Sequence, residues 1–535
     1  MTGNPEASKT VPGNKDASET GFSMFLERHP WISFAFVLVC VLPEILYSSQ
    51  LKLLWHDELF TYYIAKAPTL STLIFQTQTL DLNPPLYYLL VRGLFYVLPN
   101  TPTVCRIPSM AGFVLSMGCL YSWTRKRFGV PWGVVGVLVL ATCADIQYSL
   151  EARPYGLVLG FVSLAFVGWQ SATDQRGKLL PGLVLVVVGG FGALLSHVFA
   201  IFAWMALVLA EGVRIRIRRE FSWPVVIALL FPFLATAMYV PLIRTHAASY
   251  YPAAFQASIF GLGPYYIGLL GSPLMSLIWV VILTGLFVEK PVIQPGDQLP
   301  LTNAELTALL GLFFVPAILI LYLANAHGAF FERYGMVSNI AVAALLSSAG
   351  GWLTRGRSAV AWLAALVLFV ASPLPGGMIL LSAHPGMLSL SFQHQPVCQA
   401  CELVKRVSST LPLVDASGLT YLEMDSREDS EFLTRVYYLT DPVASIRYAH
   451  ANIFEGMARE KEVFPIRANI QGYESFVQQH SNFLVFGTYD YPEDWLLRKL
   501  QADGAHLSLL GTVDDPQFKD SQLWRVELDV HAGQK

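Results

Sequence analysis

The sequence predicts a polytopic α-helical membrane protein with about eleven spans, followed by a polar α/β domain. Two observations predict this fold class. Of the 535 residues, 54% are hydrophobic and only 14% are charged, whereas soluble domains carry about 25% charged residues. In addition, long apolar runs recur over the first 380 residues, and short breaks with charged or aromatic residues separate them.

The apolar runs approach the length that a transmembrane helix needs, about 20 residues. They lie near residues 31–47, 104–124, 131–149, 155–172, 180–196, 197–213, 223–243, 265–288, 305–324, 333–350 and 358–375. The first run begins too late and is too long for a cleaved signal peptide. We therefore expect the polar residues 1–30 to form a disordered cytoplasmic tail that leads into a retained first helix.

The breaks between the runs alternate in character, which predicts the side of the membrane that each one faces. One set is basic: "RKRFG", "DQRGK", "RIRIRRE", "VEK" and "TRGR". The other set combines aromatic residues, His, Pro and isolated charges: "WHDEL", "YSLEARPY", "SH", "RTHAASYYPAAF" and "NAHGAFFERYG". Because basic loops stay in the cytoplasm, we expect a multi-pass protein of the plasma (inner) membrane with a cytoplasmic N-terminus. Residues after about 380 would be extracytoplasmic, either periplasmic or extracellular.

The first external loop, residues 48–103, is predicted to be a folded unit whose helices lie on the membrane surface. The segment "NPPLYYLLVRGLFYVLP", residues 83–99, is apolar for only about a dozen residues, too few for a span. Its paired prolines suit the start of a helix. Within "DELFTYYIAK", apolar residues follow helical spacing on one face, which is typical of an interfacial amphipathic helix. These residues are Leu59, Phe60, Tyr63, Ile64 and Ala67.

Residues 385–535 differ in composition from the transmembrane domain of residues 31–380, and we expect them to form an extracytoplasmic α/β domain. The β-type runs "NFLVFGTY" and "HLSLLGTV" flank the helical pattern "EDWLLRKLQADG". No G-x-G-x-x-G motif or P-loop accompanies them. Cys398 and Cys401 form a C-x-x-C that is either a structural or disulfide pair or a redox or metal motif. A single pair favours the first alternative.

Two adjacent carboxylates follow the point where the first span ends. They are Asp57 and Glu58 in "LKLLWHDELF", next to His56. Neighbouring residues of a helix point about 100° apart, so the two acids do not both face one atom. Capping is one explanation, with Asp57 as the N-cap of a helix that begins at Glu58. Capping explains only one of the acids, however, and ionisable groups at such depths are functional candidates.

The outward ends of several spans carry further polar residues. They are Asp81 and Asn83 in "DLNPP", Arg106 in "CRIPSM", Arg153 in "EARPY", and His197 and Arg333. The arginines could simply reach the lipid headgroups by snorkelling. Several arginines that converge with a histidine on one side of the membrane are better explained by an anionic ligand.

These residues belong to an ordered series of motifs. "WHDELF", "DLNPPLYYLL", "CRIPS", "YSLEARPYGL", "LLSHVFAIF" and "FFERYG" follow one another between residues 31 and about 350. The series resembles the bacterial members of the GT-C glycosyltransferase superfamily, in particular the protein O-mannosyltransferase and lipid A aminoarabinose transferase group. Asn83 departs from the pattern, because many relatives carry His or Lys before the paired prolines. Any donor or acceptor contact of that side chain is therefore in doubt here.

The resemblance implies an enzyme that transfers a sugar from a polyprenyl-phosphate-linked donor to an acceptor on the outer face of the membrane. Asp57 would be the base, and Glu58 would orient it or contact the acceptor. Arg106, Arg153 and Arg333 would hold the departing phosphate, because guanidinium groups bind phosphate oxygens bidentately. The other pocket residues would be His56, Asp81, Asn83, Tyr155, His197 and Tyr334.

The same resemblance implies inverting transfer of a hexosyl or pentosyl group, for which one carboxylate is enough. No cofactor is expected. A loop with Asp, Glu and His could hold a divalent metal, but neither the spacing nor the superfamily requires one.

Two other classes of function compete with this hypothesis. A transporter or flippase of lipid-linked sugars would also use arginines in the membrane, but the sequence lacks the internal repeats typical of transporters. A scaffold anchored by its helices would not need about eleven spans and a structured first loop. The net charge of −3 argues against a nucleic-acid partner. The sequence names neither the sugar nor the acceptor, which could be a glycan, a lipid or a protein.

Overall fold

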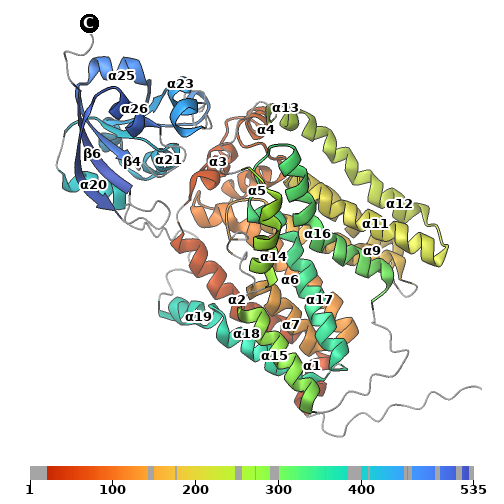
Figure 1. The fold of residues 1–535 in the computed structure, drawn as a ribbon. Helices are drawn as coiled ribbons and strands as arrows, with labels where there is room; N and C mark the ends of the chain where they lie inside the picture. The colour runs from red at the N-terminus through yellow and green to blue at the C-terminus, as the bar shows by residue number, and fades with distance from the viewer. Residues whose placement is uncertain are drawn as a thin grey trace, which may run out of the picture.

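The fold is described from a computed structural model of the chain. The structure describes residues 21–528, apart from residues 53, 143–146, 148–149, 175–176, 247–255, 271–272, 289–300, 356, 384–398, 408–409, 451–454, 456–460, 488–494 and 514–520. It has two parts: a bundle of helices and, against one end of the bundle, a small α/β domain (Figure 1). This division is the one that the sequence predicts.

The bundle is built from apolar helices of different lengths. In chain order it contains α1 (Gly21–Arg28), α2 (Pro30–Leu51), α6 (Pro102–Phe128), α7 (Val130–Thr142), α9 (Tyr155–Thr173), α10 (Leu179–Ser196), α11 (Ala200–Arg218), α12 (Trp223–Leu230), η1 (Phe231–Met238), α13 (Tyr239–His246), η3 (Ile259–Gly261), α14 (Leu262–Leu270), α15 (Pro273–Val288), α16 (Asn303–Asn325), η4 (Glu332–Gly335), α17 (Val337–Leu353), α18 (Ser358–Ala371) and α19 (Leu374–Ala383). Threonine side chains start two of the long helices. The Thr101 hydroxyl accepts the Val104 N–H at 3.3 Å, and Thr302 forms a capping box with Glu305.

Six helices in the described part are long and apolar enough to cross a membrane. They are Pro30–Leu51, Pro102–Phe128, Tyr155–Thr173, Leu179–Ser196, Trp223–Ile243 and Asn303–Asn325. The pair Ser358–Ala371 and Leu374–Leu380, bent by 55°, is a seventh candidate. Two of the other predicted spans coincide with the shorter helices α7 and α17. Another coincides with α11, whose second half is charged. The span predicted near 265–288 includes residues outside the described part.

Glycines bring α9 close to α6 at the end of the bundle that faces the α/β domain. A Cβ atom on Gly156, in the first turn of α9, would lie 2.4 Å from a carbonyl oxygen of α6. One on Gly112 of α6 would lie 2.4 Å from a Cα atom of α9. No side chain fits at such distances, so both positions need glycine. The contact fixes the first turn of α9, immediately after Arg153, against α6.

The predicted disordered tail does not extend to residue 30, because α1 occupies Gly21–Arg28. Leu26 of this helix is buried, and the Glu27 carboxylate accepts the Val130 N–H at 3.0 Å. The short apolar cluster in "GFSMFLER" does not by itself show these long-range contacts. Residues 1–20 lie outside the described part.

Three short helices form the loop between α2 and α6: α3 (His56–Ala65), α4 (Leu70–Thr79) and α5 (Leu86–Phe95). With ten residues, α5 is about 15 Å long, half the thickness of the hydrocarbon core, as expected for a segment that does not span. The apolar face of α3 is not left for lipid. Phe60 and Tyr63 are each 6% exposed and Ile64 is 0% exposed, because α5 and the α/β domain cover them. In this respect the prediction of an interfacial amphipathic helix is wrong.

The α/β domain follows the bundle and contains one six-stranded sheet. Its elements are α20 (Gln399–Arg406), β1 (Leu413–Asp415), α21 (Gly418–Arg427), α22 (Ser430–Leu433), β2 (Val436–Thr440), α23 (Pro442–Ala444), the π-helix η6 (Ser445–Ala449), β3 (Asn469–Gly472), α25 (Tyr473–Gln479), β4 (Asn482–Gly487), α26 (Leu496–Ala502), β5 (His506–Val513) and β6 (Ser521–Glu527). The strand order is β3-β2-β1-β4-β6-β5. The first four strands are parallel, with Leu413 of β1 opposite Val436 and Leu484, and β6 runs antiparallel to both of its neighbours.

The two faces of this sheet have separate cores. One core, around Phe476 and Trp495, is covered by α25 and α26. The other, around Tyr421 and Phe464, is continuous with the buried residues of α3 and α5. The domain therefore shares a hydrophobic core with the first loop. Cys401, beside this sheet, is disulfide-bonded, and Cys398 lies outside the described part.

Candidate functional site

The two adjacent acids lie in the first turn of α3. This helix begins at His56, with Trp55 as its N-cap, so Glu58 is its third residue. The Glu58 Oε2 atom accepts the Trp55 N–H at 3.3 Å, which is how an acid at this position caps a helix. The alternative that Asp57 caps a helix beginning at Glu58 is therefore wrong. The helix begins two residues earlier, and Glu58 is the capping acid.

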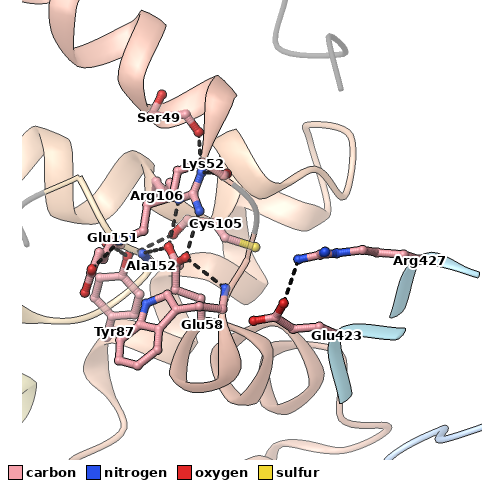
Figure 2. A network of polar contacts seen from close by, with 11 residues as sticks. Ser49, Lys52, Glu58, Tyr87, Cys105, Arg106, Glu151, Ala152, Glu423 and Arg427 are labelled. Carbon is pink, nitrogen blue, oxygen red and sulfur yellow. Dashed lines mark hydrogen bonds and ion pairs between the residues drawn. The ribbon is translucent and has the colours of Figure 1, made fainter. Parts of the chain in front are cut away.

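Glu58 and Arg106 form a fully buried ion pair (Figure 2). Arg106 Nε lies 2.7 Å from Oε1 of Glu58 and Nη2 lies 2.7 Å from Oε2, and both side chains are 0% exposed. Oε1 also accepts the Ala152 N–H at 2.6 Å. Arg106 Nη1 donates to the carbonyl oxygens of Ser49 and Lys52, the latter at 2.7 Å. The pair thus ties α3 to α6 and to the end of α2.

These contacts are at odds with the predicted roles of Glu58 and Arg106 in substrate binding. A carboxylate offers about four lone-pair sites, and Glu58 accepts four hydrogen bonds from the protein itself. The guanidinium fork that would bind a phosphate is filled by this carboxylate and by two carbonyl oxygens. We assign both residues to the positioning of α3.

The segment that precedes α9 contacts α3 and the end of α2. Glu151 pairs with Lys52 and not with Arg153, although Arg153 is only two positions away in the sequence. Arg153 Nη1 instead donates to the Asp57 carbonyl oxygen at 3.0 Å and to Asp81 Oδ2 at 2.5 Å. Ala152 and Arg153 therefore hold the first turn of α3, and Glu151 holds Lys52 at the end of α2.

Asp57 faces two arginines and a histidine. Its Oδ2 accepts from Arg333 Nη2 at 3.1 Å, and its Oδ1 lies 3.6 Å from His56 Nδ1. Burial alone would raise the pKa of Asp57, but the positive charges of Arg333 and Arg153 hold this pKa well below its ordinary value. The side chain is 23% exposed. Asp57 is therefore an accessible carboxylate that is ionised at neutral pH.

Asp81 is more enclosed, with its side chain 9% exposed. Its Oδ2 accepts from Arg153 and from the Tyr88 hydroxyl. Burial raises the pKa of Asp81, and the neighbouring Arg153 only partly offsets this effect. Asn83 donates to the Asp81 carbonyl oxygen at 3.0 Å, within the turn that precedes α5. The structure thus places Asn83 in its own turn and outside the lining of the cavity described next.

Four of the predicted residues meet in one cavity: Tyr155, His197, Arg333 and Tyr334. The other walls are mostly apolar and consist of Val158, Phe199, Ala200, Met336 and Val337. The cavity is open to solvent, and its empty space of about 310 Å³ includes part of that solvent. His197 Nδ1 accepts the Phe199 N–H at 3.2 Å, so this nitrogen carries no proton.

Aromatic rings hold the Arg333 guanidinium at the cavity. Its Cζ lies 4.4 Å from the ring centroid of Phe331, 5.2 Å from that of Trp55 and 5.9 Å from that of Tyr334. The side chain is 15% exposed, against 5% for Arg153 and 0% for Arg106. Of the three predicted arginines, Arg333 is the one that lines the cavity.

Four residues that contact this site are absent from the sequence-based prediction: Lys52, Trp55, Tyr88 and Glu151. Lys52 is a lone cation at the end of an apolar run, which is a usable signal. Tyr88 and Trp55 are indistinguishable in sequence from the many other aromatic residues nearby.

In the described part of the chain, no group of three or more His, Cys, Asp and Glu side chains is arranged to hold a metal ion.

Comparison with known proteins places this geometry in a known architecture. No protein-family model and no curated protein matches the sequence. The crystal structure of ArnT from Cupriavidus metallidurans bound to undecaprenyl phosphate is similar, with a TM-score of 0.53 at 11% sequence identity, over 94% of this chain and 98% of that chain. The fold is that of ArnT. The same protein in the apo state also matches with a TM-score of 0.53 and 11% identity, over 92% of this chain and 97% of that chain.

The ArnT-like fold confirms the predicted fold class, a GT-C type helical membrane domain followed by a small sheet domain. The fold that the motif series indicates is thus present although the sequences are only 11% identical. At this identity the likeness to ArnT concerns the fold, and the roles of individual residues rest on the contacts described above.

Proposed function

We propose that the protein is a membrane glycosyltransferase that takes a sugar from a polyprenyl-phosphate-linked donor. The observation that carries this proposal is the cavity in which the Arg333 guanidinium meets apolar walls within reach of Asp57. A lipid phosphate needs both surfaces, a cation for its head and apolar side chains for its tail. The ArnT-like fold supports the proposal, because the ArnT structure was solved with undecaprenyl phosphate bound.

Buried donors beside Arg333 are also suited to an anion. The Nε atoms of Arg333 and Arg153 and the Nε1 atom of Trp55 are buried and have no hydrogen-bond partner among the described residues. Buried N–H groups in proteins are nearly always hydrogen-bonded, so three such donors close to one carboxylate point to an acceptor-rich ligand. A phosphate provides the oxygens that these groups require.

In the proposed reaction the acceptor hydroxyl oxygen attacks the anomeric carbon while the bond from this carbon to the phosphate oxygen breaks. Asp57 receives the hydroxyl proton, and polyprenyl phosphate leaves with its charge stabilised by Arg333. When the phosphate binds Arg333, the positive charge of this guanidinium is shared between the phosphate and Asp57, and the basicity of the Asp57 carboxylate increases. One carboxylate is sufficient, which corresponds to inversion at the anomeric carbon. The reaction would take place at the outer face of the inner membrane, where the predicted topology puts α3.

The direct test is to incubate the purified full-length protein with radiolabelled polyprenyl-phosphate sugars. A transferase consumes the donor and releases polyprenyl phosphate at a rate proportional to enzyme. A flippase in sealed vesicles moves the donor between leaflets and leaves it intact, and a scaffold does neither. Donor that stays intact with every sugar and acceptor fraction tried, in protein that binds undecaprenyl phosphate, would overturn the transferase proposal.

Arg333→Lys is expected to weaken donor use by about ten- to a hundredfold, because lysine keeps the charge but loses the fork that binds two phosphate oxygens. Donor titration of initial rates measures this effect. The matched control is Arg216→Lys, an exposed arginine at the far end of α11, which should change donor use less than about twofold. Normal donor use in Arg333→Lys together with a loss in Arg153→Lys would move the phosphate to Arg153.

A further inference from the structure

The α/β domain packs on the helix that carries the proposed base. Helix α21 of the domain lies against α3 (Figure 1). The residues buried between them include Phe60 and Tyr63 from α3 and Tyr421 and Phe464 from the domain, none more than 6% exposed. An arrangement in which the domain were merely tethered would leave this face of α3 to solvent or lipid. The contact therefore fixes the two parts relative to each other at the site.

Phe464 is at the centre of this contact. Its ring stacks on Tyr63, with centroids 5.2 Å apart, and meets Phe60 edge-on at 5.5 Å. Burial and the nearby carboxylate of Asp425, from α21, raise the pKa of the Tyr63 hydroxyl. Asp425 is itself 1% exposed, and its Oδ1 accepts the N–H groups of Arg467 at 2.7 Å and Ala468 at 2.8 Å. Asp425 is thus fixed within the domain by two backbone N–H groups.

A short chain of contacts leads from Phe464 to the reacting group. Phe60, which touches Phe464, also packs on the His56 ring, with centroids 4.8 Å apart. His56 Nδ1 in turn lies 3.6 Å from Asp57 Oδ1. On its other side α3 is held by the buried pair of Glu58 and Arg106. The position of Asp57 therefore depends on two anchors, one from the membrane helices and one from the α/β domain.

We propose that the α/β domain is a working part of the active site, in which Phe464 and Asp425 are positioning residues that hold α3, and with it His56 and Asp57, in the reactive geometry. The proposal rests on the proposed transferase function for its catalytic consequence. Its structural content, that the domain holds α3, is independent of that function. Displacing a reacting group by about 1 Å costs up to a hundredfold in rate, so the anchor has a measurable effect on turnover.

The first test measures hydrogen–deuterium exchange of residues 56–65 by mass spectrometry in the full-length protein. Phe464→Leu is expected to speed exchange in α3 by about threefold or more, because local opening becomes easier when a packing partner is lost. The matched control is Phe476→Leu, which is equally buried in the same domain but lies on the opposite face of the sheet. Exchange in α3 that is no faster in Phe464→Leu than in Phe476→Leu would overturn the proposal. Should Phe464→Leu fail to fold, Tyr63→Phe, which removes only the hydroxyl, replaces it with the same expectation.

The second test is a double-mutant cycle on turnover with Tyr63→Leu and Phe464→Leu. Each single change is expected to lower kcat by about tenfold, and the double change to lower it little further, because both remove the same anchor. Donor KM should stay within about twofold, a split that general instability does not produce. Phe464→Tyr, which keeps the ring, should restore the rate. Additive losses in kcat would overturn the proposal, whereas a parent protein that does not turn over donor would count against the transferase function and leave the exchange test decisive.

Discussion

Asp57→Asn is expected to lower turnover by about a hundredfold or more while the protein folds and binds its donor at least as well as the parent. The change removes a proton acceptor and almost no volume. It also removes the carboxylate that accepts from Arg333 Nη2 at 3.1 Å, so this guanidinium is no longer shared with the protein when a phosphate arrives. Turnover and donor binding should therefore move in opposite directions. Initial rates at saturating donor, together with equilibrium binding of polyprenyl phosphate, measure the two quantities.

The other two carboxylates of the site are the controls for this prediction. Glu58 has all its oxygens engaged and is 0% exposed, and Asp81 is 9% exposed, against 23% for Asp57. We expect Glu58→Gln to affect stability more than chemistry, and Asp81→Asn to act through Arg153. If turnover stayed near normal in Asp57→Asn and fell a hundredfold in Asp81→Asn, the base would be Asp81, whose raised pKa is closer to neutrality.

The pH dependence of kcat/KM gives a further check on the same residue. A carboxylate whose pKa is lowered stays ionised until the pH falls through that lowered value, so protonation of Asp57 should not limit the rate anywhere above the ordinary aspartate pKa of about 4. Arg333 is the first cause of the lowering. Arg333→Gln should therefore shift the acid limb of the remaining activity to higher pH. An acid limb that stays in place in this variant would mean that it does not report on Asp57.

The overall architecture was predictable because it depends on properties that are local in sequence. Apolar runs and basic breaks identify the membrane domain, and alternating strand and helix patterns identify the α/β domain. The covering of α3 was not predictable in this way. Phe60 and Tyr63 have the same spacing whether they face lipid or protein, and only the three-dimensional arrangement brings Phe464, some 400 positions later in the chain, onto them.

In the site, too, the contacts of single side chains could not be predicted from the sequence. The sequence identified Arg106, Arg153 and Arg333 as one class, because each lies at the end of a predicted span. The structure separates them by their partners, since Arg106 is fully paired with Glu58, Arg153 with Asp81, and Arg333 lines the cavity. Pairing partners that lie 48 or 72 positions away leave no pattern in a single sequence. The convergence of Tyr155, His197, Arg333 and Tyr334 was nevertheless anticipated, because all four fall at the same predicted side of the membrane.

The second large effect is expected from Arg106→Met, which leaves the Glu58 carboxylate buried without its cation. Removing one partner of a buried ion pair typically costs about 3–5 kcal/mol, because the remaining charge cannot be solvated. Here both side chains are 0% exposed and joined by two hydrogen bonds of 2.7 Å. We therefore expect a lower unfolding midpoint in detergent and loss of activity together. The matched control is Arg525→Met, whose partner Glu527 lies 3.1 Å away in a pair that is 45% and 53% exposed, and which should hardly change the midpoint.

The double variant Glu58→Met/Arg106→Met distinguishes the cost of an unpaired buried charge from the loss of the contact that positions α3. With both charges gone, no unpaired ion remains, so its unfolding midpoint should lie above that of Arg106→Met. Recovery should be incomplete, because the Ala152 and Trp55 N–H groups lose the oxygens that they donate to. Turnover should not recover with stability, because the first turn of α3 is then no longer fixed to α6 and Asp57 is free to move away from Arg333. A double variant that regained both stability and full turnover would show that the pair is replaceable packing, and that the geometry of Asp57 does not depend on it.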